Sequence, residues 1–496
     1  VAGLLACLAS GCASGGSSVG KEAAADEIKK GGFTVAASCH DPQILREGDT
    51  YYMFGSHMVG AKCQDLRKWN YFANGVDAAN TLFDNLLTEP YAAFDFVGKN
   101  TDNGYSVWAS NVIYNETMKK YVMYFCTTSS YVKSTLCFAT ADNIEGPYTY
   151  VDTILYSGYG KSNISETNLY DVLGKNADIS RYLEYGGYNN KEWPNCIDPA
   201  IFTDADGRMW MNYGSWSGGI FLLEIDPATG YPIYPVDDKD ADPYYGYRLI
   251  GGGHHSAEGP YIQYDAENGY YYLFVSYGDL QSDGGYQIRQ FRSEKPTGPY
   301  VDVAGNTLED QDDHFNYGLK MMGNYTFPSL NYTYMAPGGQ STFQDDDGKY
   351  YITYHQRFDD GTEYHEPRVH QMYTNEDGWF VAAPFATMGE TLSEKGYKKS
   401  DVSGTFYVVN HGTDISSKIR EAEAYTFADG KVTGGEKSGT YEVKEGTDYI
   451  TITLDGVVYK GVLMEMTDEA ENPVFCFSAA GDNEETLWGV QYIKKE

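Results

Sequence analysis

Two aspartates in this chain, Asp41 and Asp198, each stand directly before a proline where an apolar stretch begins. The proline ring fixes its own φ and biases the residue before it toward extended backbone. Each carboxylate is therefore held on rigid backbone at the mouth of a strand. Glu258 opens a third such stretch, directly before a Gly-Pro pair. We interpret the three acids as occupying matched positions.

Three carboxylates at a common mouth repel one another, and this repulsion raises the pKa of at least one of them. One acid can then stay protonated while another is ionised, which suits general acid and general base catalysis at one site. Glycoside hydrolysis uses such a pair, whether the anomeric configuration is retained or inverted. For any single Asp-Pro the alternative is a plain turn at the start of a strand, but the three acids together favour a site.

A strand, a turn and a second strand recur five times along the chain, with almost no helical periodicity between the copies. The copies cover residues 41–54, 107–125, 195–216, 258–276 and 339–355. Repeated small meanders that cannot bury their own faces are typical of a β-propeller. We therefore predict an all-β chain with a five-bladed β-propeller, in which the first strand of each blade lines the axis. A two-sheet sandwich is the alternative, but it would not explain the similar openings of the copies.

The length of 496 residues favours more than one hydrophobic core. We place the propeller at residues 31–388. After a polar stretch the strands become shorter and cleaner, and we predict a second all-β domain, a small barrel or a sandwich, at residues 400–496. Nothing in this second domain indicates catalysis.

Residues 1–30 are interpreted as the remnant of a secretion signal followed by a linker. Within them, residues 9–12 end in Cys12 and resemble a bacterial lipobox, in which the cysteine is acylated; a plain signal peptide is the alternative. We expect a secreted or cell-surface lipoprotein of a bacterium. No apolar run approaches the roughly 18 residues that a membrane-spanning helix needs, so a lipid on Cys12 is the expected membrane attachment.

The formal net charge of -34 argues against nucleic acid and anionic membrane surfaces as partners. We expect a monomer. Six cysteines follow the signal region, and their spacing matches no zinc pattern. Cys126 and Cys137 lie in neighbouring strand-like stretches and could pair after export, but buried free thiols are favoured. The cysteines are Cys39, Cys63, Cys126, Cys137, Cys196 and Cys476.

Four of these motifs together resemble glycoside hydrolase family 43, with the greatest similarity to its endo-acting α-1,5-L-arabinanases. They lie at residues 40–42, 195–199, 213–220 and 256–261. The resemblance covers roughly residues 35 to 385 and implies a five-bladed propeller that hydrolyses internal bonds of arabinan with inversion. By this resemblance Asp41 matches the general base and Glu258 the general acid. Asp198 matches the aspartate that orients the acid and raises its pKa.

The same resemblance implies roles for residues that flank the acids. His40 belongs to the substrate site, Trp108 and Trp216 would stack on sugar rings, and Asn195, Ser215 and Ser217 would hydrogen-bond the furanose. Blade packing is the alternative for either tryptophan. Many relatives carry Trp-Ala-Pro-Asp where this chain has Trp-Ala-Ser-Asn at residues 108–111, so local substrate contacts should differ.

A cation in the propeller channel, reported as calcium in this family, is a further implication of the resemblance. His355 matches the histidine near that ion, and a satisfied core histidine is the alternative. Because hard cations prefer oxygen ligands, we expect a contact through water. No organic cofactor is expected. The resemblance also extends, more weakly, to the C-terminal domain, which is similar to one appended to some longer arabinanases.

Two other functions remain open at the level of sequence. An exo-acting α-L-arabinofuranosidase or β-xylosidase of the same family would share the three acids but need a pocket closed at one end. Long inserts at residues 72–102 and 158–193 could provide such a wall. A non-catalytic glycan-binding propeller is the other alternative, although a binding module has no use for a protonated acid among ionised ones.

Overall fold

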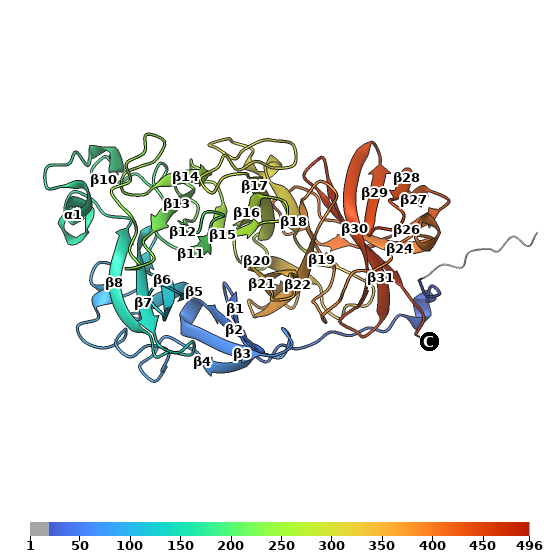
Figure 1. Cartoon of the computed structure of the whole chain (residues 1–496), viewed down its shortest axis with the longest axis horizontal. Coiled ribbons are helices and arrows are strands. Elements are labelled where there is room, and N and C mark those ends of the chain that lie inside the picture. Colours follow the sequence, from blue (N-terminus) through green and yellow to red (C-terminus); the bar gives the residue numbers. More distant parts are fainter. Residues whose placement is uncertain (1–18, 496) are drawn as a thin grey trace, which may run out of the picture.

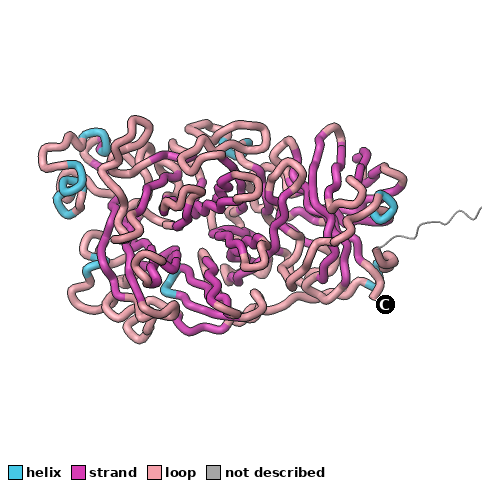
Figure 2. Tube along the Cα trace, viewed as in Figure 1, coloured by secondary structure: helices cyan, strands magenta, loops and turns pink. Residues whose placement is uncertain are grey.

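The computed structural model describes residues 19–495 and shows a propeller beside a barrel (Figure 1). The expected lipobox around Cys12 lies outside these residues. Strands account for most of the regular structure, with only short helices between them (Figure 2). The predicted all-β class is confirmed.

Five antiparallel sheets, each built from one continuous stretch of chain in its four main strands, form the blades of the described propeller (Figure 1). Blade one holds β1 (Gln43–Glu47), β2 (Thr50–Gly55), β3 (Val59–Cys63) and β4 (Asn70–Ala73); blade two holds β5 (Ser106–Asn115), β6 (Lys120–Ser130), β7 (Lys133–Ala141) and β8 (Thr149–Tyr156); blade three holds β11 (Ala200–Thr203), β12 (Met209–Tyr213), β13 (Ile220–Ile225) and β14 (Tyr247–Ile250); blade four holds β15 (Ala257–Asp265), β16 (Tyr270–Tyr277), β17 (Gln287–Ser293) and β18 (Leu319–Met322); and blade five holds β20 (Tyr334–Gln344), β21 (Tyr350–Phe358), β22 (His365–Thr374) and β23 (Phe380–Ala382). The prediction of five blades is confirmed.

The five repeated hairpins of the sequence are the two inner strands of each blade. In blade three, Ala200 pairs with Asn212 and Thr203 with Met209. The tight turn between these strands places Gly207 at a φ of 82°, a left-handed backbone that glycine adopts without steric cost. The Asp/Gly turns therefore set the register that brings the strand mouths to the axis.

Blades one and five close the ring through side chains, because no strand passes from one blade into the other's main sheet. Arg46 of β1 forms an ion pair with Asp345 at the end of β20. The hydroxyl of Tyr51 donates to the same carboxylate at 2.6 Å. Nearer the axis, Ser341 Oγ donates to the carbonyl oxygen of Pro42 at 2.8 Å.

The two long inserts lie at the side of the propeller away from the barrel (Figure 1). The second insert contains α1 (Leu169–Leu173), β9 (Leu183–Glu184) and β10 (Gly187–Tyr188). Short 3-10 helices occur in the inserts and in other connections, at Ala25–Glu27, Ser56–Met58, Ala92–Phe94, Ile164–Glu166, Ser180–Tyr182, His314–Asn316 and Lys399–Asp401.

The C-terminal domain is a closed barrel, so of the two predicted forms the barrel is correct and the sandwich is not. Its strands follow one another around the barrel and the last pairs with the first: β24 (Gly404–Asn410), β26 (Glu423–Ala428), β27 (Lys431–Gly434), β28 (Lys437–Val443), β29 (Tyr449–Leu454), β30 (Val457–Thr467), β31 (Pro473–Gly481) and β32 (Thr486–Tyr492). Strand β29 shows the alternation that fills the interior, since Ile450, Ile452 and Leu454 are buried and the residues between them are partly exposed.

The outer face of the barrel shares one apolar cluster with blades four and five. Trp488 of β32 is fully buried in this cluster, and its ring centroid lies 5.1 Å from that of Tyr325. Tyr325 belongs to the short strand β19 (Tyr325–Thr326), which pairs with β20 on one side and with β25 (Arg420–Glu421) on the other. A sequence-distant segment, residues 19–30, also contacts the barrel, where Ala23 N–H donates to Tyr492 O at 2.8 Å.

All six cysteines that follow the signal region are buried free thiols, as the sequence analysis favoured. Cys137 pairs in register with Phe125, so Cys126 does not face it across the strands. No helix in the described part of the chain is long and apolar enough to cross a membrane.

Candidate active site

Five short segments, one at the mouth of each inner strand, surround a small cavity of about 40 Å³ on the propeller axis. The first residue of each has a left-handed backbone, with φ between 48° and 57°. These first residues are Asp41, Ala109, Asp198, Gly259 and Gly339. The repeated bend shows that the mouths are equivalent positions of the five blades. Because an ordinary side chain adopts this backbone only at a cost, surrounding contacts must hold it.

The equivalence corrects one part of the sequence interpretation. Asp41 and Asp198 occupy the bend, but blade four places Gly259 there, and Glu258 stands one residue earlier. The proline that follows the bend marks the register, not the carboxylate. The side chain of Glu258 therefore belongs with those of His40 and Trp108, which also precede a bend.

A larger cavity of about 370 Å³ lies at the mouth of the channel, and all three predicted acids line it. His40 and Trp108, which the sequence analysis predicted to contact substrate, also line this cavity. The lining residues are His40, Asp41, Ser56, His57, Trp108, Ile197, Asp198, Glu258, Leu280, Tyr286, Arg357, Glu363 and His365. The cavity thus brings together side chains from loops and strands that are more than 300 residues apart.

Asp41 is surrounded by donors. His40 Nδ1 lies 2.8 Å from Asp41 Oδ2, and Ser56 Oγ donates to the same oxygen at 2.5 Å. Burial raises the pKa of Asp41, but His40, Ser56 and the nearby His57 outweigh it, and the pKa is lowered below its ordinary value. Gly339 leaves room for this carboxylate, since a Cβ there would lie 2.3 Å from Asp41 Oδ1. Asp41 is therefore ionised at neutral pH.

Glu258 has the opposite tendency. Burial raises its pKa above the ordinary value, and the charge of Asp41 adds to this increase. Two hydrogen bonds act against the increase without cancelling it: Tyr286 donates to Oε1 at 2.6 Å and Ser215 Oγ to Oε2 at 2.9 Å. The site therefore contains one carboxyl group that favours the ionised form and another that favours the protonated form.

Asp198 is the third carboxyl group of the cavity, and Gly259 N–H donates to its Oδ2 at 3.2 Å. Burial raises the pKa of Asp198 well above its ordinary value, and the charges of Asp41 and Glu258 raise it further. The sequence analysis expected Asp198 to raise the pKa of Glu258 by repulsion. In the structure, burial is the largest cause for both groups.

Gly259 N–H is free to donate to Asp198 because the preceding blade has a glycine, Gly214, where the other blades have an accepting side chain. At three of the other bends the backbone N–H donates to a side chain of the preceding blade: Ala109 to Ser56 at 2.9 Å, Gly339 to Ser276 at 2.9 Å, and Asp41 to His355 Nδ1 at 3.4 Å. In blade three the corresponding position is Gly214, whose N–H donates to Ile197 O. Gly214 has no side chain to offer, so Gly259 N–H is left for Asp198.

The remaining predicted substrate residues lie at different depths. Ser215 contacts Glu258 directly. Trp216, Asn195 and Ser217 do not line the 370 Å³ cavity. The ring of Trp216 lies 5.3 Å from that of His254, and Ser217 N–H donates to His254 Nδ1 at 3.1 Å. Asn195 accepts a hydrogen bond from Ser157 at 3.4 Å. Trp216 and Ser217 therefore lie beside His254 outside the cavity lining, and Asn195 is engaged with Ser157.

Several residues of the site were not predicted from the sequence. Tyr286, which binds Glu258, and Ser56, which binds Asp41, act on residues of other segments and carry no local motif. Arg357 and His365 flank the turn between β21 and β22, and the Arg357 guanidinium contacts Glu363 at 2.8 Å. The one available signal was Arg357, which stands two residues after the predicted His355.

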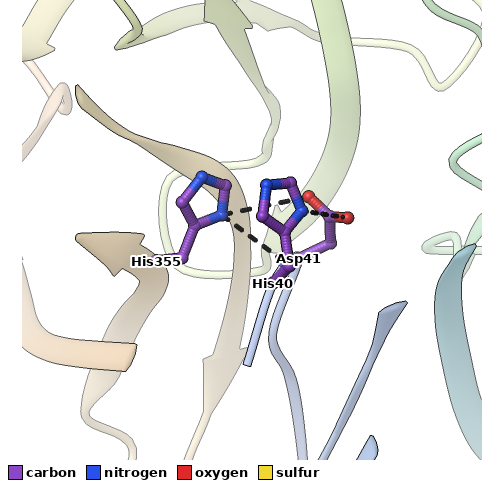
Figure 3. Close-up of side chains that lie close together, drawn as sticks. All are labelled: His40, Asp41 and His355. Atoms are coloured by element: carbon purple, nitrogen blue, oxygen red, sulfur yellow. Dashed lines mark hydrogen bonds and ion pairs between the residues drawn. The ribbon is translucent and has the colours of Figure 1, made fainter. Parts of the chain in front are cut away.

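His40, Asp41 and His355 form the group that could hold a metal ion among the described residues, with candidate ligand atoms within 4.8 Å of one another (Figure 3). The rings of His40 and His355 stack at 4.0 Å. His40 Nδ1 is engaged with the Asp41 carboxylate, and His355 Nδ1 accepts the N–H of Asp41. His355 must then carry its proton on Nε2, a buried atom without a hydrogen-bond partner in the described protein. This arrangement does not suit direct nitrogen ligation, but it fits a water bound to Nε2–H.

The comparisons with known proteins agree with this geometry. Residues 172–380 match the model of glycosyl hydrolases family 43, and residues 384–489 match its C-terminal lipocalin-like domain. The chain is 38% identical over 467 residues to an extracellular endo-α-(1→5)-L-arabinanase of Bacillus subtilis, covering 91% of this chain and 92% of the relative. It is 36% identical to the corresponding enzyme of Thermotoga petrophila, covering 92% and 94%. The crystal structure of a family 43 glycoside hydrolase from Bacillus licheniformis superposes with a TM-score of 0.80 at 36% identity, covering 93% of this chain and 99% of that one.

We predict that Asp41 loses its proton at lower pH than Glu258. The order should follow because hydrogen bonds and positive charge favour the Asp41 carboxylate, whereas burial disfavours the Glu258 carboxylate. Carboxyl-selective carbon NMR can follow both groups, with Asp41→Asn and Glu258→Gln assigning the signals. In Ser56→Ala the pKa of Asp41 should rise, since one donor to the charged form is lost. A titration in which Glu258 ionises first would contradict the assignment of their protonation states.

Proposed function

The chain belongs to glycoside hydrolase family 43, and from this we propose that it is an extracellular endo-1,5-α-L-arabinanase. It would hydrolyse internal α-1,5-L-arabinofuranosyl bonds of arabinan by single displacement, with inversion at the anomeric carbon. The relatives of 36 to 38% identity that cover nearly the whole chain support the substrate and the extracellular setting. The observation that carries the mechanism is the pair of acids with opposite pKa shifts in one cavity.

Asp41 would act as the general base. Its ionised carboxylate can accept a proton from a water molecule as that water attacks the anomeric carbon. Its second oxygen is kept in place by His40 and Ser56. Glu258 would act as the general acid, because its raised pKa keeps the proton that the departing sugar oxygen must receive. An inverting enzyme needs room for the water between base and sugar, and the cavity of about 370 Å³ supplies space at this point.

Asp198 would position Glu258 and would help to keep a proton on this pair of carboxyl groups. It is fixed through Gly259, the residue that follows Glu258. Two neighbouring carboxyl groups of raised pKa favour a state in which at least one proton stays with the pair. Trp108 and His40 would contact the sugar in the cavity. Trp216 and Ser217 would contact sugars further out, beside His254.

An exo-acting enzyme of the same family is the main alternative, and the position of the inserts bears on it. Neither residues 72–102 nor residues 158–193 contribute to the lining of the 370 Å³ cavity. The second insert instead contacts the region around Trp216 and His254: Asn190 donates to Tyr131 at 3.1 Å, Gly218 N–H donates to Trp193 O at 3.0 Å, and Gly253 N–H donates to Lys191 O at 3.1 Å. Tyr131 in turn contacts His254. This placement favours a cleft that accepts an internal segment of a chain.

The product profile on debranched linear arabinan tests the proposed function. We expect a mixture of arabino-oligosaccharides early in the reaction, because internal cleavage yields long products first. Glu258→Gln should lose activity by roughly 10²–10⁴-fold, the usual contribution of an acid or base catalyst. Surface variant Glu445→Gln, far along the barrel sequence, serves as the matched control and should keep activity. Arabinose as the sole early product would establish the exo alternative, and absence of turnover would leave only a binding protein.

We further propose that the channel holds one hydrated cation, with calcium the expected ion. His355 Nε2–H would contact it through water, and the ionised carboxylate of Asp41, which lines the channel cavity, would attract it. When bound, such an ion offsets negative charge beside the catalytic acids. In this proposal the ion does not bind the reacting sugar.

Chelation should therefore lower both melting temperature and activity, and added Ca²⁺ should restore them. A ligand at 100 times its Kd stabilises a fold by about 2.7 kcal/mol, so the melting temperature should fall by several degrees. Elemental analysis should find about one calcium per chain before chelation. Metal-free protein with unchanged melting and unchanged turnover would rule the cation out.

Surface attachment through acylated Cys12 is also proposed, on the basis of the lipobox-like sequence and the Gly/Ser-rich stretch that follows it. A bacterial lipoprotein carries more than one acyl chain, enough for stable anchoring. In the expressing bacterium, Cys12→Ala of the full precursor should move the protein from the membrane fraction to the medium. Cys7→Ala is the matched control and should not. An unchanged membrane fraction in Cys12→Ala would refute the anchor.

A further inference from the structure

A segment of the C-terminal domain lies against the two blades that carry Glu258 and Tyr286 on one side and His355 on the other. Residues 411–421, here called the barrel arm, leave β24 and lie against blades four and five. The arm ends in β25, which pairs in parallel with β19: Tyr325 with Arg420, and Thr326 with Glu421. The sheet of blade five thus gains an edge strand, beyond β20 and β19, from the C-terminal domain.

Buried side chains of blade four hold the arm through its backbone. Gln287 Nε2 donates to Asp414 O at 2.9 Å, and Lys320 Nζ donates to the same oxygen at 2.8 Å. The guanidinium of Arg289 donates to Thr413 O. All three side chains are at most 4% exposed. Buried polar groups of this kind are costly to leave without partners, so the arm has a fixed position on the blade.

The arm also fits closely against the chain next to Tyr286. Gly285 has a φ of 74°, and a Cβ added there would lie 2.7 Å from the backbone nitrogen of Ser416. No other residue type could occupy position 285 without displacing the arm. The arm therefore packs directly against the backbone at Gly285, and Tyr286 is the next residue along the chain.

Ile419 of the arm packs against the small apolar cluster that contains Tyr286. The cluster consists of Tyr286, Met335 and Ala336, and Leu280 packs against it as well. Tyr286 is 2% exposed. Its hydroxyl donates to Glu258 Oε1 at 2.6 Å, and its ring stacks with that of His355 at 5.6 Å. Leu280 and Tyr286 both line the 370 Å³ cavity.

We propose that Ile419 of the barrel arm is a positioning residue for the general acid, acting through Tyr286 on Glu258. The barrel is then part of the catalytic architecture and not a module appended to an independent propeller. Ile419 is not among the residues that line the 370 Å³ cavity. It supports the ring whose hydroxyl fixes the direction of the Glu258 carboxyl group, and the proposal rests on the general-acid role assigned to Glu258 above.

Leaving-group dependence tests this role, because a misplaced acid matters only where the leaving oxygen needs a proton. Ile419→Ala should lower kcat on linear arabinan on the order of tenfold, as expected when a reacting group is slightly displaced. It should leave kcat on a dinitrophenyl arabino-oligosaccharide within about twofold, since that leaving group needs little protonation. Ile419→Val should restore most of the arabinan activity.

Two further variants separate positioning from stability. Ile415→Ala alters the same arm, but Ile415 packs against a different cluster, so its rates on the two substrates should change equally or not at all. In a Tyr286→Phe background, which lacks the hydroxyl, Ile419→Ala should have little further effect on the ratio of the two rates. Melting temperatures of all variants are measured alongside.

The inference fails if Ile419→Ala lowers both rates by the same factor, or if its effect persists in full on the Tyr286→Phe background. If the wild-type protein still releases arabino-oligosaccharides in those assays, only the inference about Ile419 fails and the proposed function stands. If the wild-type protein has no activity on arabinan, the proposed function itself is wrong.

Discussion

The architecture of the site depends on one constraint: a buried backbone N–H at each strand mouth must find an acceptor. The bend at every mouth turns that N–H away from its own sheet. Side chains of the preceding blade supply acceptors at most of the bends. Three of these hydrogen bonds are given above, and in a fourth the backbone of Asp198 binds the Cys126 thiol of blade two. Neighbouring blades are thereby joined at the axis, where the inner strands are closest. At the blade three position Gly214 supplies nothing, and an active-site carboxylate takes the place of the structural acceptor.

The surroundings of the strand mouths also determine which of the three carboxyl groups carries a proton. Asp41 sits where blades five and one meet, among two histidines and a serine that favour its ionised form. Asp198 sits on blade three and Glu258 on blade four, where burial dominates and neutral donors are too few to offset it. Three carboxyl groups in one cavity could not all ionise at moderate cost. The asymmetry of their surroundings decides which one does, and this asymmetry is what single displacement requires of a base and an acid.

How far the sequence could predict this structure depended on whether the signal was local. Asp-Pro and Gly-Pro pairs and Asp/Gly turns act within a few residues, so five inner hairpins and the meeting of three acids were predictable. The register of Glu258 was not, because a longer side chain one residue earlier reaches the same cavity. Barrel closure depends on pairing β24 with β32, about 80 residues apart in sequence, which strand patterning cannot distinguish from a sandwich.

Contacts between blades and between domains were hidden for the same reason. Tyr286 follows two glycines and resembles many other tyrosines of this chain, yet its hydroxyl binds the acid. Ile419 stands among polar residues of a loop more than 130 residues further on. Neither has a periodicity or a motif, since each is defined by the surface it meets in three dimensions. Where the sequence was informative, backbone geometry carried the information; where it was not, the contact was long-range packing.

The central claim is that Asp41 and Glu258 act on opposite sides of the sugar as base and acid in one displacement. The stereochemistry of the first-formed product tests it most directly. Proton NMR during the first turnovers on a linear arabino-oligosaccharide, before mutarotation, distinguishes the anomers. The account predicts that the new reducing end appears first as the β-anomer. An initial α-anomer would require a covalent intermediate and a nucleophile in place of the base, and would contradict the account.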